Sequence, residues 1–184
     1  MNPSAQTATN EAGLGEVLFG KGDIPAFAIL DGASAPALVK NIYDHEPEYC
    51  CLYRGELSPD IATIAPYLVR LEPGAKFTEW VLNEGWGVHW GVFLVSTGTL
   101  RILRNHFREF YTVELPNQRT VLFRYYDPRV LRSFLPACNA AELAAFFGPV
   151  QKFVVEGEKA EAGINFSLAG TALKPEPFQL KKPS

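Results

Sequence analysis

Residues 119–130, RTVLFRYYDPRV, place Arg124, Asp127 and Arg129 close together at the end of an apolar run. Such a group of charges could be an active site or a structural joint. Aspartate at the N-cap followed by proline is a favoured helix start, so we predict that Asp127 caps a helix beginning at Pro128. Arg124 should then pair with a carboxylate, either Asp127 or an acid on a neighbouring strand, because an unpaired buried guanidinium is very costly. Arg129 should be exposed.

Cysteines and histidines are the other residues that could support nucleophilic or metal chemistry. Cys50 and Cys51 are adjacent and Cys138 is distant, which fits neither a disulfide framework nor a zinc site, so we expect small buried hydrophobes. The histidines share no metal-ligand spacing; they are His45, His89 and His106. We therefore expect no metal and no cofactor. The enzymatic alternative is a small hydrolase or transferase that uses a Cys/His pair or Asp127 with a histidine.

The glycine-rich stretch GWGVHWG, residues 85–91, resembles a phosphate-binding loop only superficially. Its glycine spacing differs from the dinucleotide fingerprint, and a strand-like run follows where a helix is needed. The sequence also contains neither a P-loop with its lysine nor a Gly-x-Ser-x-Gly nucleophile motif. A nucleotide-binding module would rest on GWGVHWG alone, and no small-molecule substrate is expected.

Composition limits the classes of partner. The formal net charge of −3 and the pI of about 5.7 supply no global basic field for a nucleic-acid backbone, so nucleic acid is disfavoured. The first residues lack a basic start, and no run of about eighteen apolar residues follows that could span a membrane. We expect a soluble, cytoplasmic protein without a membrane partner.

Hydrophobic periodicity predicts a single compact domain of the α/β (α+β) class, with a mixed sheet that contains antiparallel pairs and is flanked by helices. The 184 residues suit one domain. The strand at 87–96 is apolar on both faces, which favours helices on both sides of the sheet. Expected strands are 24–33, 50–56, 66–71, 87–96, the hairpin 111–115 with 119–126, and 151–157. One expected helix begins at 34–36 and places Leu38, Val39, Ile42 and Tyr43 on one face. The other expected helices span 58–65, 76–84, 99–110, 128–135 and 139–147.

Composition shifts divide the chain into three parts. Residues 1–22 are expected to be a flexible N-terminal arm, 23–157 the compact domain, and 158–184 a C-terminal extension or tail. Two features mark the domain: Pro66 can begin a strand because its missing N–H is tolerated there, and Gly85 can end a helix.

The predicted helix 99–110 has two contrasting faces. At about 100° per residue, one stripe is apolar and faces the core; it contains Leu100, Leu103, Phe107 and Phe110. The opposite stripe is basic and contains Arg101, Arg104, Asn105 and Arg108. This stripe is either a solvated face or a docking surface for an acidic partner.

Several motifs together carry a resemblance to a known family. In chain order they are APYLVRL (65–71), GWG (85–87), LVS (94–96), LRILRNHFRE (100–109), VLFRYYDPRVLRSFLP (121–136) and FFGPV (146–150). This ordered set, above all FRYYDPRV, resembles the domain-of-unknown-function family of bacterial type VI secretion effector chaperones, also called adaptors. The resemblance covers roughly residues 25–150. The matching positions are Pro66, Tyr67, Gly87, Ser96, His106, Arg108, Arg124, Asp127, Pro128 and Arg129.

The resemblance implies a non-enzymatic adaptor that binds a cognate toxic effector and helps load it onto the valine-glycine-repeat (VgrG) spike for delivery. Its partners would be proteins, namely the effector and the spike. We predict that partner binding uses Arg101, Arg104, Arg108, Arg124 and Arg129. We predict a structural role for Pro66, Gly87, Asp127 and Pro128.

Overall fold

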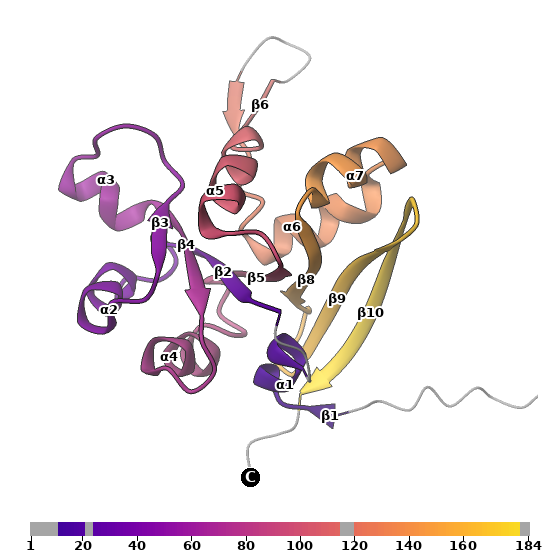
Figure 1. The fold of residues 1–184 in the computed structure, drawn as a ribbon, viewed down its shortest axis with the longest axis horizontal. Coiled ribbons are helices and arrows are strands. Elements are labelled where there is room, and N and C mark those ends of the chain that lie inside the picture. Colours follow the sequence, from indigo (N-terminus) through magenta and orange to yellow (C-terminus); the bar gives the residue numbers. More distant parts are fainter. Residues whose placement is uncertain (1–10, 21–23, 115–119, 181–184) are drawn as a thin grey trace, which may run out of the picture.

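A large sheet forms the centre of the molecule in the computed structural model, which describes residues 11–20, 24–114 and 120–180 (Figure 1). Within these residues the sheet has eight strands in the order β1-β10-β9-β8-β5-β2-β4-β3. All neighbouring strands are antiparallel except β1 and β10, which are parallel. The strands are β1 Glu11–Ala12, β2 Ala26–Asp31, β3 Tyr49–Cys51, β4 Pro66–Leu71, β5 Gly91–Ser96, β8 Val150–Glu156, β9 Ala162–Ala169 and β10 Ala172–Leu180.

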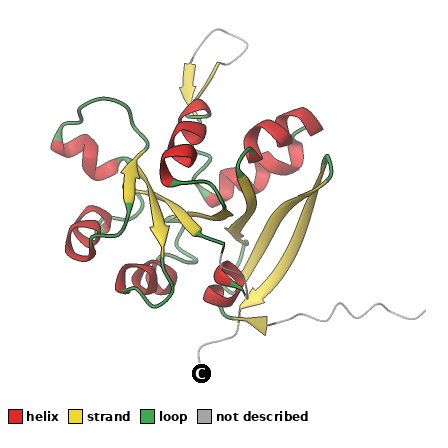
Figure 2. Cartoon of the chain, in the orientation of Figure 1, coloured by secondary structure: helices red, strands yellow, loops and turns green. Residues whose placement is uncertain are grey.

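Helices cover both faces of this sheet (Figure 2). They are α1 Leu14–Phe19, α2 Leu38–His45, α3 Pro59–Ile64, α4 Lys76–Glu84, α5 Leu100–Glu109, α6 Pro128–Phe134 and α7 Ala140–Phe147, with a short 3-10 turn at Leu135–Ala137. Phe27 and Ile29 of β2 pack into a core with α5, α6 and α7, whereas Ala28 and Leu30 pack into a second core with α1, α2 and α4. Because side chains alternate along a strand, one sheet serves both cores. The predicted α+β domain with helices on both sides is confirmed.

Several predicted strands are shorter than expected. The strand predicted at 87–96 begins only at Gly91, because Gly87 and His89 adopt positive φ angles of 83° and 63° and the chain turns there. The strand predicted at 50–56 is β3, which ends at Cys51. The helix α2 also differs from its predicted face, since Tyr43 is 81% exposed instead of buried. Leu38 and Ile42 are the buried residues of that helix, and Val39 packs against the same core while partly buried.

A hairpin continues the sheet beyond position 157, where the sequence predicted a polar tail. Strands β9 and β10 pair over eight residue pairs. Leu180 N–H donates to the Glu161 carbonyl at 2.7 Å, and hydrogen-bonded pairs alternate along an antiparallel ladder. Pro175 and Pro177 therefore fall at positions whose backbone faces away from β9. The prolines that suggested a tail are compatible with a strand at a sheet edge.

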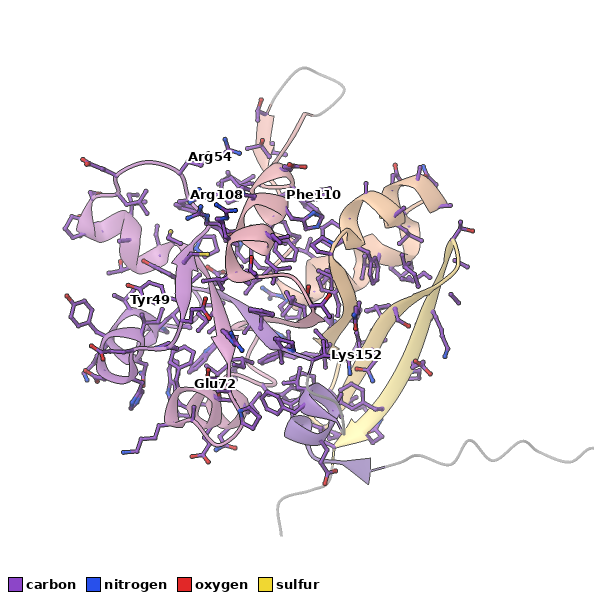
Figure 3. The ribbon with its side chains drawn as sticks, viewed as in Figure 1. Tyr49, Arg54, Glu72, Arg108, Phe110 and Lys152 are labelled. Atoms are coloured by element: carbon purple, nitrogen blue, oxygen red, sulfur yellow. The ribbon has the colours of Figure 1, made fainter. Side chains whose placement is uncertain are left out.

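Part of the predicted N-terminal arm is structured as well. Leu14 and Leu18 of α1 are buried in the second core. The Lys152 ammonium on β8, labelled in Figure 3, donates to the Val17 carbonyl at 2.6 Å and so fixes the helix against the sheet. The pKa of Lys152 is lowered because burial disfavours its charged form.

The predicted hairpin after α5 is present as β6 (Thr112–Glu114) and β7 (Thr120–Leu122), which form a separate antiparallel pair. Its predicted turn at Pro116–Gln118 lies outside the described residues. The strand that was predicted to continue to Tyr126 ends at Leu122, so Arg124 lies in the connection between β7 and α6. Among the described residues, no helix is both long and apolar enough to cross a membrane.

Candidate partner-binding site

Helix α5 presents its basic side beside the edge strand β3. Thr99 caps the helix by accepting a hydrogen bond from Ile102 N–H at 3.3 Å. Leu103 and Phe107 are completely buried, and Leu100 and Phe110 pack around them at the margin of the core. The predicted apolar stripe is therefore confirmed.

Arg108 belongs to the predicted basic stripe but turns toward the protein. Its guanidinium donates to three successive backbone carbonyls, those of Cys51 at 3.0 Å, Leu52 at 3.1 Å and Tyr53 at 2.8 Å. These bonds satisfy carbonyls where β3 ends and hold α5 against the sheet margin. Of the two alternatives for the stripe, a solvated face does not describe Arg108, because a long side chain on a helix can reach an adjacent strand.

Arg101 and Arg104 keep their charges available. Arg101 is exposed, and the Nε of half-buried Arg104 is covered without a hydrogen-bond partner among the described residues. Arg54, on the loop after β3, is exposed as well. None of these three guanidinium groups forms an ion pair within the part of the chain that the structure describes.

A surface hollow of about 370 Å³ lies between α5 and the loop after β3. It is lined by Arg54, Asn105, Arg108 and Glu109. Figure 3 shows Arg54 and Arg108 at the same end of the sheet, next to α5. Arg54 lines this hollow, and Arg101 and Arg104 lie on the same face of α5 as Arg108, so these unpaired arginines can bind a carboxylate through charge-assisted hydrogen bonds. We call Arg54, Arg101 and Arg104 the basic site.

The other predicted binding arginines are paired within the chain. Arg124 binds the carboxylate of Asp31, which lies buried at the end of β2, and its guanidinium also lies 5.9 Å from the centre of the Tyr126 ring. Burial alone would lower the pKa of Arg124, but the bond to Asp31 outweighs it and the pKa is raised. The observed partner is not Asp127. It is an acid on another strand, but β2 lies in the main sheet and does not neighbour β7, so the prediction is correct only in that the acid comes from a different strand.

Asp127 caps α6 as the sequence predicted, and Pro128 is the first residue of that helix. Its Oδ1 accepts from Arg129 N–H at 3.0 Å, while the Arg129 guanidinium donates to both carboxylate oxygens at 3.0 and 2.7 Å. Burial would raise the pKa of Asp127, but the hydrogen bonds from Arg129 dominate and lower it. Arg129 is exposed as expected, but Nε and Nη2 of its guanidinium are hydrogen-bonded to Asp127.

Pro66 and Gly87 also have structural roles. Pro66 begins β4, and its carbonyl accepts from Leu52 N–H at 2.9 Å across the β3–β4 pair. Gly87 has a φ of 83°, and a Cβ added there would lie 2.9 Å from the Cβ of Ala160. Only glycine fits this position without strain.

A buried carboxylate lies at the end of β8, and no sequence signal predicted it. Glu156 is 1% exposed, and its Oε2 lies 2.8 Å from Nδ1 of His89 and accepts from His89 N–H at 3.2 Å. Its Oε1 is buried without a partner among the described residues. Burial raises the pKa of Glu156, partly opposed by the hydrogen bonds from His89. The positive φ of His89 brings its backbone and its ring to one carboxylate, which no sequence spacing reveals.

The groups named in the enzymatic alternative are engaged elsewhere. Burial raises the pKa of the Cys50 thiol to about 11, although Arg104 and Arg108 oppose this shift. Such a thiol is protonated at neutral pH and is a poor nucleophile. His106 Nε2 lies 2.8 Å from the Phe146 carbonyl, so this ring links α5 to α7. In the described part of the chain, no cluster of three or more His, Cys, Asp or Glu could hold a metal ion.

Comparison with known proteins identifies one family. The model of a family described as "Domain of unknown function (DUF4123)" matches residues 26–145. This range runs from β2 into α7 and includes α5, the basic site and the Asp127 joint. No curated protein and no solved structure matches the chain.

Proposed function

We propose that this chain, which belongs to the DUF4123 family, is an effector adaptor of bacterial type VI secretion. In this proposal it binds a cognate toxic effector in the cytoplasm and helps load it onto the VgrG spike. It acts by binding and catalyses no reaction. The observation that carries the proposal is the family match, because it covers residues 26–145 and the family is associated with type VI secretion.

The surface beside α5 supports a protein-binding role. An arginine that is half-buried and unpaired is unfavourable in the isolated chain, whereas a partner carboxylate would satisfy it. Arg104 has this property, and Arg54 and Arg101 add positive charge nearby. Arginine is also among the residues that protein interfaces enrich.

A co-expression pull-down tests the proposal. The chain is produced with the effector and spike proteins encoded beside its gene, and a stable complex with the effector is expected. The Arg101→Glu/Arg104→Glu variant should lose much of this binding while its circular dichroism spectrum and unfolding midpoint stay close to wild type.

A matched control keeps the same change in net charge. Lys159→Glu/Lys174→Glu alters two exposed lysines on the β8–β9–β10 side of the sheet, far along the strand order from α5. It should bind like wild type. If no effector or spike binds the wild-type chain, although each is soluble, the adaptor proposal is refuted. Equal loss in both variants would show that net charge matters and the basic site does not.

A further inference from the structure

We propose that β3 is a docking edge, onto which an extended acidic segment of the effector adds as a further strand of the sheet. This inference rests on the proposed function and names the binding mode. In such β-augmentation, backbone hydrogen bonds supply affinity and neighbouring side chains supply specificity.

The hydrogen-bond pattern shows which backbone groups of β3 face outward. Arg70 N–H donates to the Glu48 carbonyl at 2.8 Å, and Leu52 N–H donates to the Pro66 carbonyl at 2.9 Å. Bonded and non-bonded pairs alternate in an antiparallel ladder, so Tyr49 and Cys51 turn their N–H and carbonyl groups away from β4.

Only one of these outward groups is used within the described chain. The Cys51 carbonyl accepts from the Arg108 guanidinium. The N–H and carbonyl of Tyr49 and the N–H of Cys51 have no hydrogen-bond partner among the described residues. Both groups of Tyr49 can therefore bond to a single residue of an added antiparallel strand, with the Cys51 N–H giving a third bond.

The two edges of the sheet differ in a way that favours β3. On β10, the outward positions 175 and 177 are prolines, which have no N–H to offer, and β1 covers positions 179 and 180. Prolines at such positions protect an edge strand against further pairing. The outward positions of β3 are Tyr49 and Cys51, and both retain an N–H.

Charge defines the occupant. Beyond the C-terminal end of β3 lie Arg54 and the hollow beside α5, with Arg104 close enough to influence the Cys50 thiol. Before its N-terminal end lie the exposed carboxylates Glu46 and Glu48, of which Glu48 is paired with Arg70 at 3.3 Å. An added segment with carboxylates toward the arginine end complements this charge gradient. A segment with basic residues toward the arginines and acidic residues toward the glutamates would be repelled at both ends.

Apolar side chains near the same edge would contact such a segment. Tyr49 is 45% exposed, and the helices on this side of the sheet, α2 and α3, also expose large apolar residues (Figure 1). They are Tyr43, Ile61 and Ile64. These residues favour an effector segment with apolar residues along β3 and acidic residues toward the arginine end.

The first test uses overlapping synthetic peptides that cover the effector encoded beside the gene, with binding measured by fluorescence anisotropy. At least one acidic peptide should bind wild type. Tyr49→Pro removes an outward N–H without removing a bond to β4, and we expect about tenfold weaker binding, as for one or two lost hydrogen bonds. The control Tyr49→Ala removes the side chain and keeps the N–H, so its loss should be clearly smaller.

Charge is tested on the same peptide. Replacing its acidic residues by lysine should abolish binding, and Arg54→Glu should weaken binding of the original peptide. The control Lys159→Glu should leave binding unchanged. A peptide that binds equally well after its acidic residues are replaced would overturn the assigned occupant.

Hydrogen exchange on the wild-type chain gives a readout that needs no variant to fold. The amides of Tyr49 and Cys51 should become protected when the peptide or the whole effector binds. If the effector binds but these amides stay unprotected and Tyr49→Pro binds normally, the edge proposal is overturned and the adaptor function stands. If neither effector nor spike binds at all, the proposed function itself fails.

Discussion

Replacing Asp127 by alanine tests how the joint between β7 and α6 is stabilised. Asp127 is the N-cap of α6, and the substitution removes the acceptor for the Arg129 N–H. Loss of an aspartate cap costs about 0.5–2 kcal/mol of the free energy of unfolding. For a domain of this size that corresponds to a decrease of roughly 1–8 °C in the midpoint of thermal unfolding.

The asparagine variant separates capping from charge. Asp127→Asn keeps an oxygen that can accept from the Arg129 N–H but loses the ion pair with the guanidinium. Because Arg129 is exposed, this pair should contribute little, and Asp127→Asn should be clearly more stable than Asp127→Ala.

The pH dependence has a definite sign. The pKa of Asp127 is lowered in the folded state, so its ionised form stabilises the fold at neutral pH. That contribution is fully present above the carboxyl's ordinary pKa and is lost as pH falls through the lower folded-state value. The stability difference between wild type and Asp127→Asn should therefore shrink in strongly acidic solution.

Urea denaturation, followed by circular dichroism at neutral and acidic pH, measures these differences. An unchanged unfolding free energy for Asp127→Ala would refute the capping role. Partner binding by folded Asp127→Ala should match wild type, and a selective loss of binding would instead place Asp127 in the interface.

Three further changes probe other parts of the structure. Glu156→Gln should gain stability relative to wild type as pH rises through the raised folded-state pKa of Glu156, because ionisation of this buried carboxyl is costly. Urea denaturation at several pH values measures the two free energies of unfolding. A difference between them that does not change with pH would contradict the prediction. Gly148→Ala should lower the free energy of unfolding by at least about 1 kcal/mol, because φ at this position is +46° and the new Cβ would lie 2.4 Å from the His106 ring. Adding His106→Ala should recover part of this loss. If the effects of the two substitutions on the free energy of unfolding are fully additive, the clash is excluded. Phe107→Ala should cost about 3–5 kcal/mol, because the ring is fully buried and stacks on Tyr125 at 5.6 Å; calorimetry or urea denaturation showing less than about 1 kcal/mol would contradict this packing.

Local signals in the sequence were sufficient for much of the fold. The helix starts predicted at Pro128 and at position 139 are both observed, and the structure shows Asp127 and Asn139 as the N-caps. The information for a cap lies within a few residues, so tertiary context changes it little. The apolar stripe of α5 was predictable for the same reason.

Contacts between distant residues were beyond the sequence. Nothing in the spacing of Arg108 indicates that it reaches the carbonyls after β3, and nothing pairs Arg124 with Asp31 in particular. Strand β10 was missed because Pro175 and Pro177 are unfavourable in a central strand. They are compatible with an edge strand because their backbone does not bond to β9, and this is known only once the structure shows which residues of β10 bond to β9.

The parallel pairing of β1 with β10 has a consequence for the order of the chain. It brings Glu11 beside Gln179 and Ala12 beside Leu180, so a short linker from 180 to 11 would span little distance. Gly170, in the β9–β10 turn, is exposed, and a Cβ there would meet nothing within 4 Å. Circular permutation at this turn would make β10 the first strand while every pairing of the sheet is kept. The topology thus depends on which strands meet and little on where the polypeptide is opened.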